Sequence, residues 1–188
     1  MNDNSILVEM IKTEMKKINR KGIPEFVDWL AENTDFFEAP ASTRYHGAEE
    51  HGLIFHSLAV YSNLYTLANH KYTRDSIALV SFFHDLCKAN YYIKSSRNVK
   101  NEVTGLWEKV PCYTVNEQLP FGGHGSKSVY LLMKHGIELT DEEATAINCH
   151  MGGWDSTTYS NPSGAFNKYP LAVYLHLADM LATYIDKQ

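Results

Sequence analysis

The sequence places a histidine beside an aspartate, His84-Asp85, directly after the apolar pair Phe82-Phe83. Burying a carboxylate among apolar side chains is costly unless a compensating charge or hydrogen bond accompanies it. A metal ion held by both side chains is the simplest compensation. Because histidine–aspartate dipeptides are common, the pair predicts a metal site only if further ligands occur at suitable places along the chain.

Three predicted helices each direct an ionisable side chain toward the interior. His56, His84 and Asp179 lie on, or border, apolar stripes that recur with helical spacing. Taken singly, each has an ordinary interpretation, such as a core histidine with one hydrogen bond or an aspartate paired with a lysine. Together they are costly in one small core unless they share a charged partner, and a divalent cation fits best.

Two further histidines stand next to glycines. His124 lies within Gly122–Gly125, just before an expected helix, and His150 ends a helix shortly before Gly152. Glycines let the backbone approach a ligand closely. The ordinary alternatives are a loop histidine for His124 and, for His150, a favourable partner of a helix C-terminus.

The spacing of apolar residues predicts a helical protein with one insertion. Two N-terminal helices are expected within residues 1–38, the first ending near Gly22. Later helices are expected at about 53–69, 75–88, 125–135 and 140–150 and from Pro170, with a polar loop at 152–168. β-forming residues around a polar turn predict a β-hairpin. We therefore expect an all-α bundle with a small β-hairpin insertion (about residues 90–118), forming a single domain of residues 1–188.

The composition of the chain limits the classes of protein to which it can belong. With 188 residues, 44% of them hydrophobic, the chain can form one compact core. No apolar run is long enough to span a membrane, and the polar N-terminus is not a signal peptide. Three scattered cysteines without a Cys-x-x-Cys motif favour a reducing cytoplasm. A net charge of −5 argues against non-specific duplex binding.

The order of the candidate ligands resembles that of a known superfamily. The HD superfamily of metal-dependent phosphohydrolases has ligands in the same order as His56, His84-Asp85 and Asp179. The presence of His124 and His150 between Asp85 and Asp179 resembles the six-ligand, two-metal branch of that superfamily. Similar segments in the HD half of a bacterial 3′→5′ exoribonuclease correspond here to Tyr45-His46, Gly52–His56, His84–Lys88, Gly123-His124, His150 and His176–Asp179. The resemblance covers about residues 40–187, as an HD core on which residues 1–38 would pack. The exonuclease's RNA-binding OB domain has no counterpart in this sequence, so processive RNA degradation is not implied.

The resemblance implies a two-metal site. One metal would be held by His56, His84, Asp85 and Asp179, and the second by Asp85, His124 and His150. Asp85 would bridge two metals ~3.5–4 Å apart, and a hydroxide between them would attack phosphorus. Mixed histidine and carboxylate ligands suit Fe, Mn, Co, Ni or Zn without distinguishing them.

Candidate substrate groups lie near these ligands in the sequence. Besides Asp85, the expected catalytic residues are Lys88, which would project near the face of His84 on a continuous helix, and His46. The expected substrate-binding residues are Arg44, Lys88, Lys94, Arg97 and Trp154. Basic and aromatic residues in one region suit a nucleotide. The ordinary alternatives are a solvated lysine at a helix end and a solvated hairpin.

The sequence thus favours a metal-dependent phosphohydrolase or phosphodiesterase acting on a nucleotide or short phosphodiester. Its expected partner is a small phosphorylated substrate, and oligomerisation stays open. One alternative is an HD-fold di-iron oxygenase, because some of those enzymes use a similar ligand set. Another is a non-catalytic module that binds metal and nucleotide.

Overall fold

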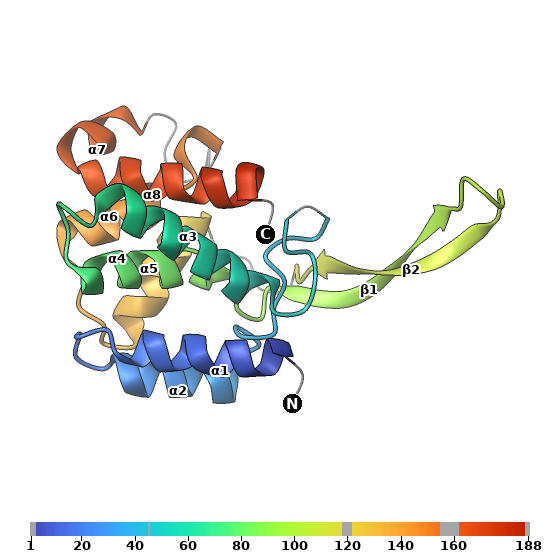
Figure 1. Ribbon diagram of the computed structural model, residues 1–188, viewed down its shortest axis with the longest axis horizontal. Coiled ribbons are helices and arrows are strands. Elements are labelled where there is room, and N and C mark those ends of the chain that lie inside the picture. The colour runs from blue at the N-terminus through green and yellow to red at the C-terminus, as the bar shows by residue number, and fades with distance from the viewer. Residues whose placement is uncertain (1–2, 45, 118–121, 155–161, 187–188) are drawn as a thin grey trace.

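The computed structural model describes residues 3–44, 46–117, 122–154 and 162–186. It is a bundle of helices from which one β-hairpin projects (Figure 1). The predicted combination of a helical bundle and a hairpin insertion is therefore confirmed. Within the described ranges, no helix has both the length and the apolar character needed to cross a membrane.

The elements follow the order expected from the sequence. In chain order they are α1 (Asp3–Lys16), α2 (Ile23–Asn33), α3 (Gly52–Ala68), α4 (Arg74–Phe83), β1 (Tyr92–Lys100), β2 (Trp107–Val115), α5 (His124–Lys134), α6 (Asp141–Cys149), α7 (Ser163–Lys168) and α8 (Pro170–Met180). Short 3₁₀ segments lie at Leu86–Lys88 and Gly152–Trp154, and a π-helical segment, Leu181–Asp186, continues α8.

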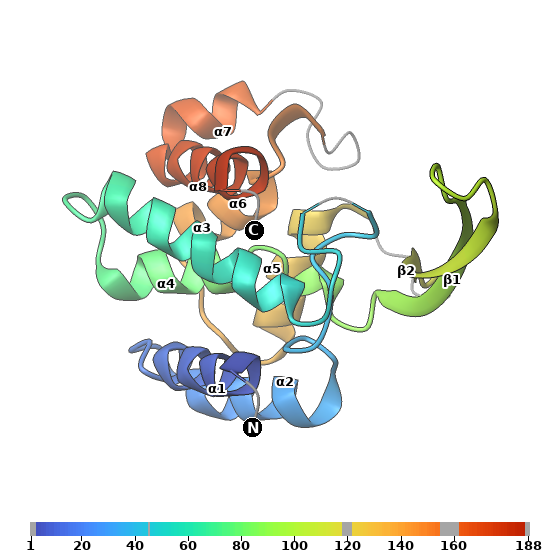
Figure 2. The same ribbon diagram turned by 45° about the vertical axis from the view of Figure 1, so that its right-hand side comes forward.

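The helices form three stacked groups around one apolar core (Figures 1 and 2). The pair α1 and α2 packs on one side of a middle group made of α3, α4 and α5. On the other side, α8 contacts α3, and α6 contacts both α5 and α8. Fully buried side chains come from every group, including Met15, Val27, Leu64, Leu79 and Leu175. The N-terminal helices thus pack on the rest of the bundle.

A capping box and a buried ion pair fix the start of α6. The Thr140 hydroxyl accepts a hydrogen bond from the Glu143 backbone N–H, and the Glu143 carboxylate accepts one from the Thr140 N–H. That carboxylate also receives two hydrogen bonds from Arg20 and one from Ser76. Because Arg20 precedes α2 and Ser76 lies in α4, one buried carboxylate ties three parts of the bundle together.

Three predicted boundaries were wrong. The first helix ends at Lys16 rather than near Gly22, and a short helix, α7, lies in the segment expected to be loop. The helix expected over 75–88 ends at Phe83. His84 caps it, Asp85 leaves helical geometry with φ −101° and ψ 21°, and the Cys87 N–H donates to the Ser128 hydroxyl instead of continuing the ladder. The chain therefore turns at the residue pair that carries the chemistry.

The projecting hairpin consists of β1, β2 and their connecting turn, and we call it the arm (residues 92–115). Its strands are antiparallel, with Tyr92 opposite Val115 at the base and Lys100 opposite Trp107 near the tip. The Asn101 side chain accepts hydrogen bonds from two backbone N–H groups of the turn, and Gly105 takes the left-handed conformation. The two strands pack chiefly on each other, so the arm extends into solvent.

Candidate metal centre

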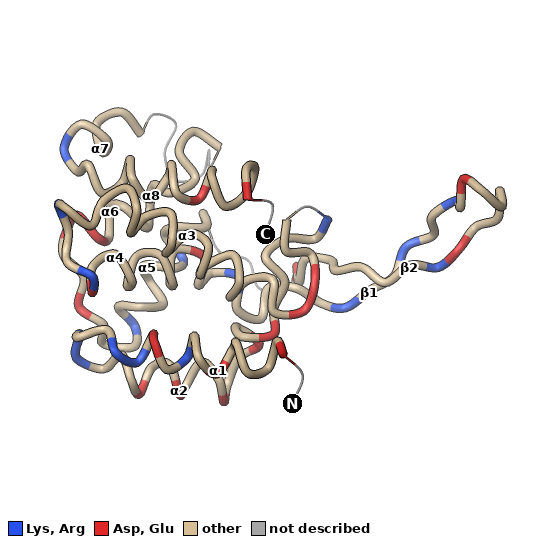
Figure 3. Tube along the Cα trace, in the orientation of Figure 1, with Lys and Arg blue, Asp and Glu red and all other residues tan. Residues whose placement is uncertain are grey.

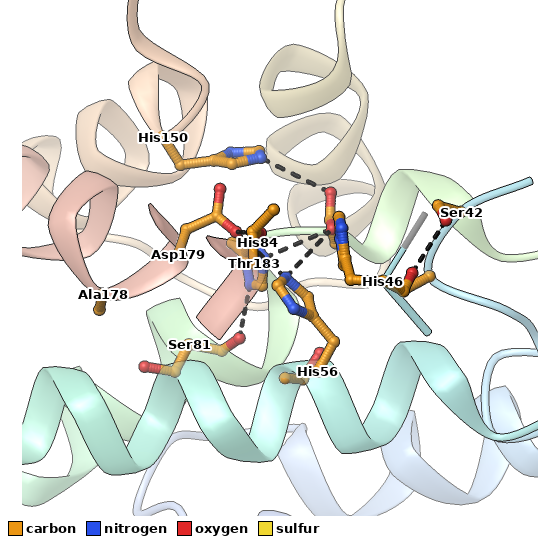
Figure 4. Close-up of polar contacts among 12 residues, drawn as sticks. Ser42, His46, His56, Ser81, His84, His150, Ala178, Asp179 and Thr183 are labelled. Carbon is orange, nitrogen blue, oxygen red and sulfur yellow. Dashed lines mark hydrogen bonds and ion pairs between the residues drawn. The ribbon is translucent and has the colours of Figure 1, made fainter. Parts of the chain in front are cut away.

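Four helices deliver ionisable side chains to one place inside the bundle. His56 comes from the middle of α3, His84 and Asp85 follow α4, His150 caps α6, and Asp179 lies near the end of α8. Figure 4 shows the rings of His56, His84 and His150 and the carboxylate of Asp179 arranged around a common space. These five residues, with His124 at their edge, are called the metal centre below.

The three imidazole rings are buried with ring nitrogens that have no hydrogen-bond partner. His56, His84 and His150 are at most 1% exposed. Within the described part of the chain, the Nε2 atoms of all three rings form no hydrogen bond, and neither does Nδ1 of His56. A buried polar atom without a partner is destabilising, and such atoms are rare in folded proteins. Their convergence is the strongest structural sign that the centre holds a ligand.

Backbone contacts orient two of these rings for metal binding. Nδ1 of His84 lies 2.7 Å from the Ser81 carbonyl oxygen, and Nδ1 of His150 lies 2.7 Å from the Ile147 carbonyl oxygen. A carbonyl can only accept a hydrogen bond, so each Nδ1 must carry the proton. In the neutral ring, the inward-facing Nε2 then has a free lone pair, which is the form that binds metal ions.

Asp85 is the most connected group of the centre. Its Oδ2 atom lies 2.6 Å from Nζ of Lys88 and 3.4 Å from Nε2 of His84. The same oxygen is 3.9 Å from Nε2 of His56, while Oδ1 is 3.5 Å from Nε2 of His150. One carboxylate thus faces all three buried rings. This is the position expected of a bridging ligand.

Both carboxylates of the centre are ionised at neutral pH. Burial raises the pKa of Asp85, but the Lys88 ammonium and the His84 ring outweigh it and hold that pKa well below its usual range. Burial likewise opposes ionisation of Asp179, yet the neighbouring His56 and His84 rings bring its pKa down. Asp179 also accepts a hydrogen bond from Thr183, one turn along. The centre therefore offers two negative charges to a cation.

The pKa values of the buried histidines shift in opposite directions. Burial lowers the pKa of His56, and the nearby Asp179 does not fully compensate. For His84, burial is outweighed by Asp85 and Asp179, so its net shift is upward. His56 Nε2 lies 3.1 Å from Asp179 Oδ1, an ion-pair distance without the alignment of a hydrogen bond. A divalent cation would provide these rings and carboxylates with a common partner.

The described residues contain three overlapping groups whose ligand atoms lie within 4.8 Å of one another. They are His56 with His84 and Asp179, His84 with Asp85 and His150, and Asp85 with Cys87 and His124. Every one of the six predicted ligands falls in at least one group. Such donors fit a divalent transition metal. How the six ligands divide between two metal ions stays a prediction.

Sequence reasoning did not select Cys87 as part of the site. Its Sγ atom lies 3.4 Å from Nδ1 of His124 and 4.0 Å from Oδ1 of Asp85. Burial raises the pKa of this thiol to about 12. Cys87 had appeared only as one of three scattered cysteines, and its place two residues after Asp85 was the available signal. Its position makes it a seventh potential ligand.

Lys88 and His46 both lie at the centre, although Lys88 reaches it by an unexpected route. On a continuous helix Lys88 would have stacked near His84, but the 3₁₀ segment instead directs its ammonium onto Asp85. His46 comes from the loop before α3, with its ring centroid 5.0 Å from that of His56. Burial lowers the pKa of His46 to about 4, and the nearby His56 ring and Lys88 ammonium act in the same direction. It is therefore neutral at physiological pH.

The predicted substrate residues are not all brought together. Arg44 is exposed on the loop before α3, and Trp154 is 63% exposed, with its ring 5.9 Å from that of His176. Lys94 and Arg97 lie on the arm, where strand alternation places them on opposite faces. Tyr45, quoted above beside His46, lies outside the described ranges.

Two glycines allow the helices of the centre to pack closely. A Cβ on Gly125, next to His124, would lie 2.4 Å from the carbonyl oxygens of Ile147 and Asn148 in α6. Gly152, two residues after His150, has φ +58°, and a Cβ there would come within 2.8 Å of the His176 ring. Nδ1 of His176 in turn lies 2.6 Å from the His150 carbonyl oxygen. His176 therefore contacts the backbone of His150, and it belongs to none of the groups of described residues that could hold a metal ion.

Comparisons with models of protein families, with curated proteins and with solved structures return no match. The function must therefore be argued from the geometry and chemistry of the residues.

Proposed function

We propose that the protein is a metal-dependent phosphohydrolase or phosphodiesterase that acts on a nucleotide or a short phosphodiester. The observation that carries the proposal is the convergence of three buried imidazole Nε2 atoms, all without hydrogen bonds, on two ionised carboxylates. The order of these residues along the chain resembles that of the HD superfamily of metal-dependent phosphohydrolases, and this resemblance supports the proposal.

The residues fit two divalent cations with Asp85 as the shared ligand. His56, His84 and Asp179 would hold one ion, and His124 and His150 would hold the other. When bound, such ions supply Lewis acidity and an activated water molecule. Cys87 lies close enough to add a thiolate ligand on the side of His124.

The polar groups at the edge of the centre define the side from which substrate would approach. The Lys88 and Asp179 side chains are 12% and 16% exposed, whereas those of His56, His84 and His150 are at most 1% exposed. A substrate phosphate would compete with Asp85 for the Lys88 ammonium, a charge-assisted contact that favours anions. Neutral His46 could accept a hydrogen bond from a water molecule or substrate hydroxyl at the same edge.

The proposed reaction is the addition of water across one P–O bond. The water oxygen forms a bond to phosphorus, the bond to the leaving oxygen breaks, and one proton from the water ends on the leaving oxygen. In this scheme the chain needs no nucleophilic serine or cysteine, and the raised pKa of Cys87 makes its thiol unsuited to that role in the metal-free protein.

The test combines metal analysis with a substrate screen. Purified protein is loaded separately with Mn, Fe, Co, Ni or Zn, its metal content is measured, and phosphate or nucleoside release is followed with a panel of nucleotides and dinucleotides. We expect about two metal ions per chain and metal-dependent turnover of at least one compound. His84→Gln should abolish both. The matched control is His135→Gln, because His135 packs on Trp29 rather than in the centre.

Three outcomes would contradict the proposal. Protein that binds no metal after loading has no metal centre. Iron-loaded protein that consumes oxygen without releasing phosphate is an oxygenase. Metal-loaded protein that binds nucleotides but releases no product with any of them is a binding module.

A further inference from the structure

The arm has two faces of different chemistry. In an antiparallel ladder, residues opposite each other point to the same side, and successive residues of one strand alternate between sides. The register places ten residues on one side, among them Tyr92, Lys94, Lys100, Trp107, Lys109 and Tyr113, and we call this side the cationic face. The other side, which we call the apolar face, carries Ile93, Ser95, Arg97, Val99, Glu108, Val110, Cys112 and Thr114.

The two faces differ in net charge. All three charged residues of the cationic face are lysines, whereas Arg97 and Glu108 balance each other on the apolar face. Among the described residues, the one carboxylate within 4.0 Å of a lysine of the cationic face is Glu50, beside Lys94 at the base. Figure 3 shows the basic positions along both strands, from the base of the arm toward its tip. The arm is thus locally basic in a chain whose net charge is −5.

Lysines and aromatic rings are paired across the strands of the cationic face. Lys94 lies opposite Tyr113, and Lys100 lies opposite Trp107. Six residues along β1 separate the two pairs, a distance of about 20 Å. Trp107 is 70% exposed, so its ring is accessible for stacking. Between the pairs, Lys109 lies opposite the uncharged Asn98.

We propose that the cationic face binds single-stranded nucleic acid. Lysines can pair with successive phosphates, while the bases of a single strand, unlike those of a duplex, are free to stack on aromatic rings. An acidic chain with only a narrow basic ribbon is poorly suited to a duplex. The binding does not require hydrolysis, so it goes beyond the function proposed above.

The position of the arm gives the bound strand a direction toward the metal centre. Tyr92, at the base of the cationic face, directs its hydroxyl to the Ala41 carbonyl oxygen at 3.4 Å, in the loop that leads to His46. Burial raises the pKa of the Tyr92 phenol to about 12, and the Lys88 ammonium partly opposes that rise. A strand lying along the cationic face therefore ends beside the exposed edge of the centre.

The test measures binding of fluorescently labelled oligothymidylate and oligouridylate, each about 20 nucleotides long, to the intact protein by anisotropy. For three phosphate contacts, the slope of log affinity against log salt should be about −2. Lys100→Glu should weaken binding at least about tenfold and make that slope shallower by roughly 0.7. Its matched control is Arg97→Glu, which makes the same charge change on the apolar face of the same strand and should alter affinity less than about threefold.

A second pair of variants tests stacking. Trp107→Ala should weaken binding about tenfold without changing the salt slope, whereas Val99→Ala, on the apolar face, should leave binding unchanged. Far-ultraviolet circular dichroism and metal content establish that each variant keeps its fold.

Several results would overturn the proposal. Equal losses of oligonucleotide affinity for Lys100→Glu and Arg97→Glu would mean that the ligand does not bind preferentially to the cationic face. Tighter binding to duplex than to single strands would exclude stacking as the source of affinity. Because Val103 and Leu106 at the tip are 95% and 67% exposed, vesicles containing phosphatidylserine are also tested. Binding to vesicles but not to oligonucleotides would assign the arm to lipid instead.

Discussion

The metal centre and the arm use charge in opposite ways. The centre buries His56, His84, His150 and Asp85 among helices that are far apart in the sequence. Burial lowers the pKa of His56, while charged neighbours outweigh burial at His84 and Asp85. The arm holds its lysines in water on two strands that pack chiefly on each other. Charges in water cost little to place, whereas buried charges require the whole bundle to hold them in position.

Because of this difference, the stability of the two regions depends to different degrees on contacts with the rest of the chain. A two-stranded hairpin is at best marginally stable in water when isolated, so the arm gains its order from its anchoring at the bundle and from any partner. The centre is stable only if the helices meet correctly. We therefore expect substitutions in the centre to affect folding and function together, and substitutions in the arm to affect binding alone.

The largest effect should follow removal of the charge at the middle of the centre. Asp85→Asn leaves the Lys88 ammonium without its carboxylate partner, and breaking a buried pair in this way costs about 3–5 kcal/mol. Metal content should fall to background in the same variant. Urea unfolding and elemental analysis measure the two effects. Asp28→Asn removes an exposed partner of Lys16 and should cost less than about 1 kcal/mol; equal stability of the two variants would break the comparison.

The rates at which the three cysteines react should differ between the buried centre and the exposed arm. Burial raises the pKa of Cys87 to about 12 and that of Cys149 to about 11, while Cys112 lies partly exposed on the arm. Relative to an ordinary thiol, this lowers the thiolate population of Cys87 about a thousandfold. Ellman's reagent, applied to metal-free native protein at mildly alkaline pH, should modify Cys112 first. Rapid loss of all three thiols before unfolding would show that the centre is open to solvent.

Glu143→Gln tests whether the centre depends on distant packing. The carboxylate at the start of α6 pairs with Arg20, and its loss should cost about 2 kcal/mol at neutral pH. Burial opposes ionisation of Glu143, but its hydrogen bonds from Arg20 and Ser76 give a net pKa below the usual 4.5. The pair therefore contributes fully above pH 4.5, and the contribution is lost as pH falls through the lower folded-state pKa.

The stability difference between wild type and Glu143→Gln should accordingly shrink toward zero in acid, as followed by urea titrations at several pH values. Glu25→Gln, an exposed change on α2, serves as the control and should show no comparable loss. A difference that grows on acidification would contradict the sign of the shift. Because His150 caps the other end of α6, we also expect Glu143→Gln to weaken metal binding.

The smallest effect should come from shortening the arm. Replacing residues 94–113 by Asn-Gly, which favours the tight turn needed between Ile93 and Thr114, removes most of both strands. Because those residues pack chiefly on one another, the unfolding free energy should change by less than about 0.5 kcal/mol. Metal content should be unchanged while oligonucleotide binding is lost. A large drop in metal content would show that the two regions are not independent.

Sequence reasoning located most of the centre because its ligands leave a clear signal. His56 interrupts an apolar stripe on α3, and His150 ends α6 just before two glycines, so each is conspicuous for its type and place. The helical bundle and the hairpin were also predictable, since apolar spacing and turn residues are local features. These local patterns set which elements form and which side of each element faces inward.

The remainder depends on contacts between distant parts of the chain. The turn at Asp85 depends on Ser128, forty-one residues away from Cys87, which takes the Cys87 N–H that a continuing helix would have used. For the same reason the proximity of Cys87 to His124 could not be read from spacing. The separation of Lys94 and Arg97 onto opposite faces required the strand boundaries and their register.

The glycine beside His124 has a consequence for how the chain can change. With no side chain, Gly125 lets α5 and α6 approach until a Cβ would overlap the Ile147 and Asn148 carbonyl oxygens. The gap between those two helices acts as a spacer that sets the separation of His124 from His150. Any larger residue would widen that spacer and, in the metal centre proposed above, would change the size of cation that the pair could hold. A single added methyl group could thus alter the proposed metal preference without replacing any ligand.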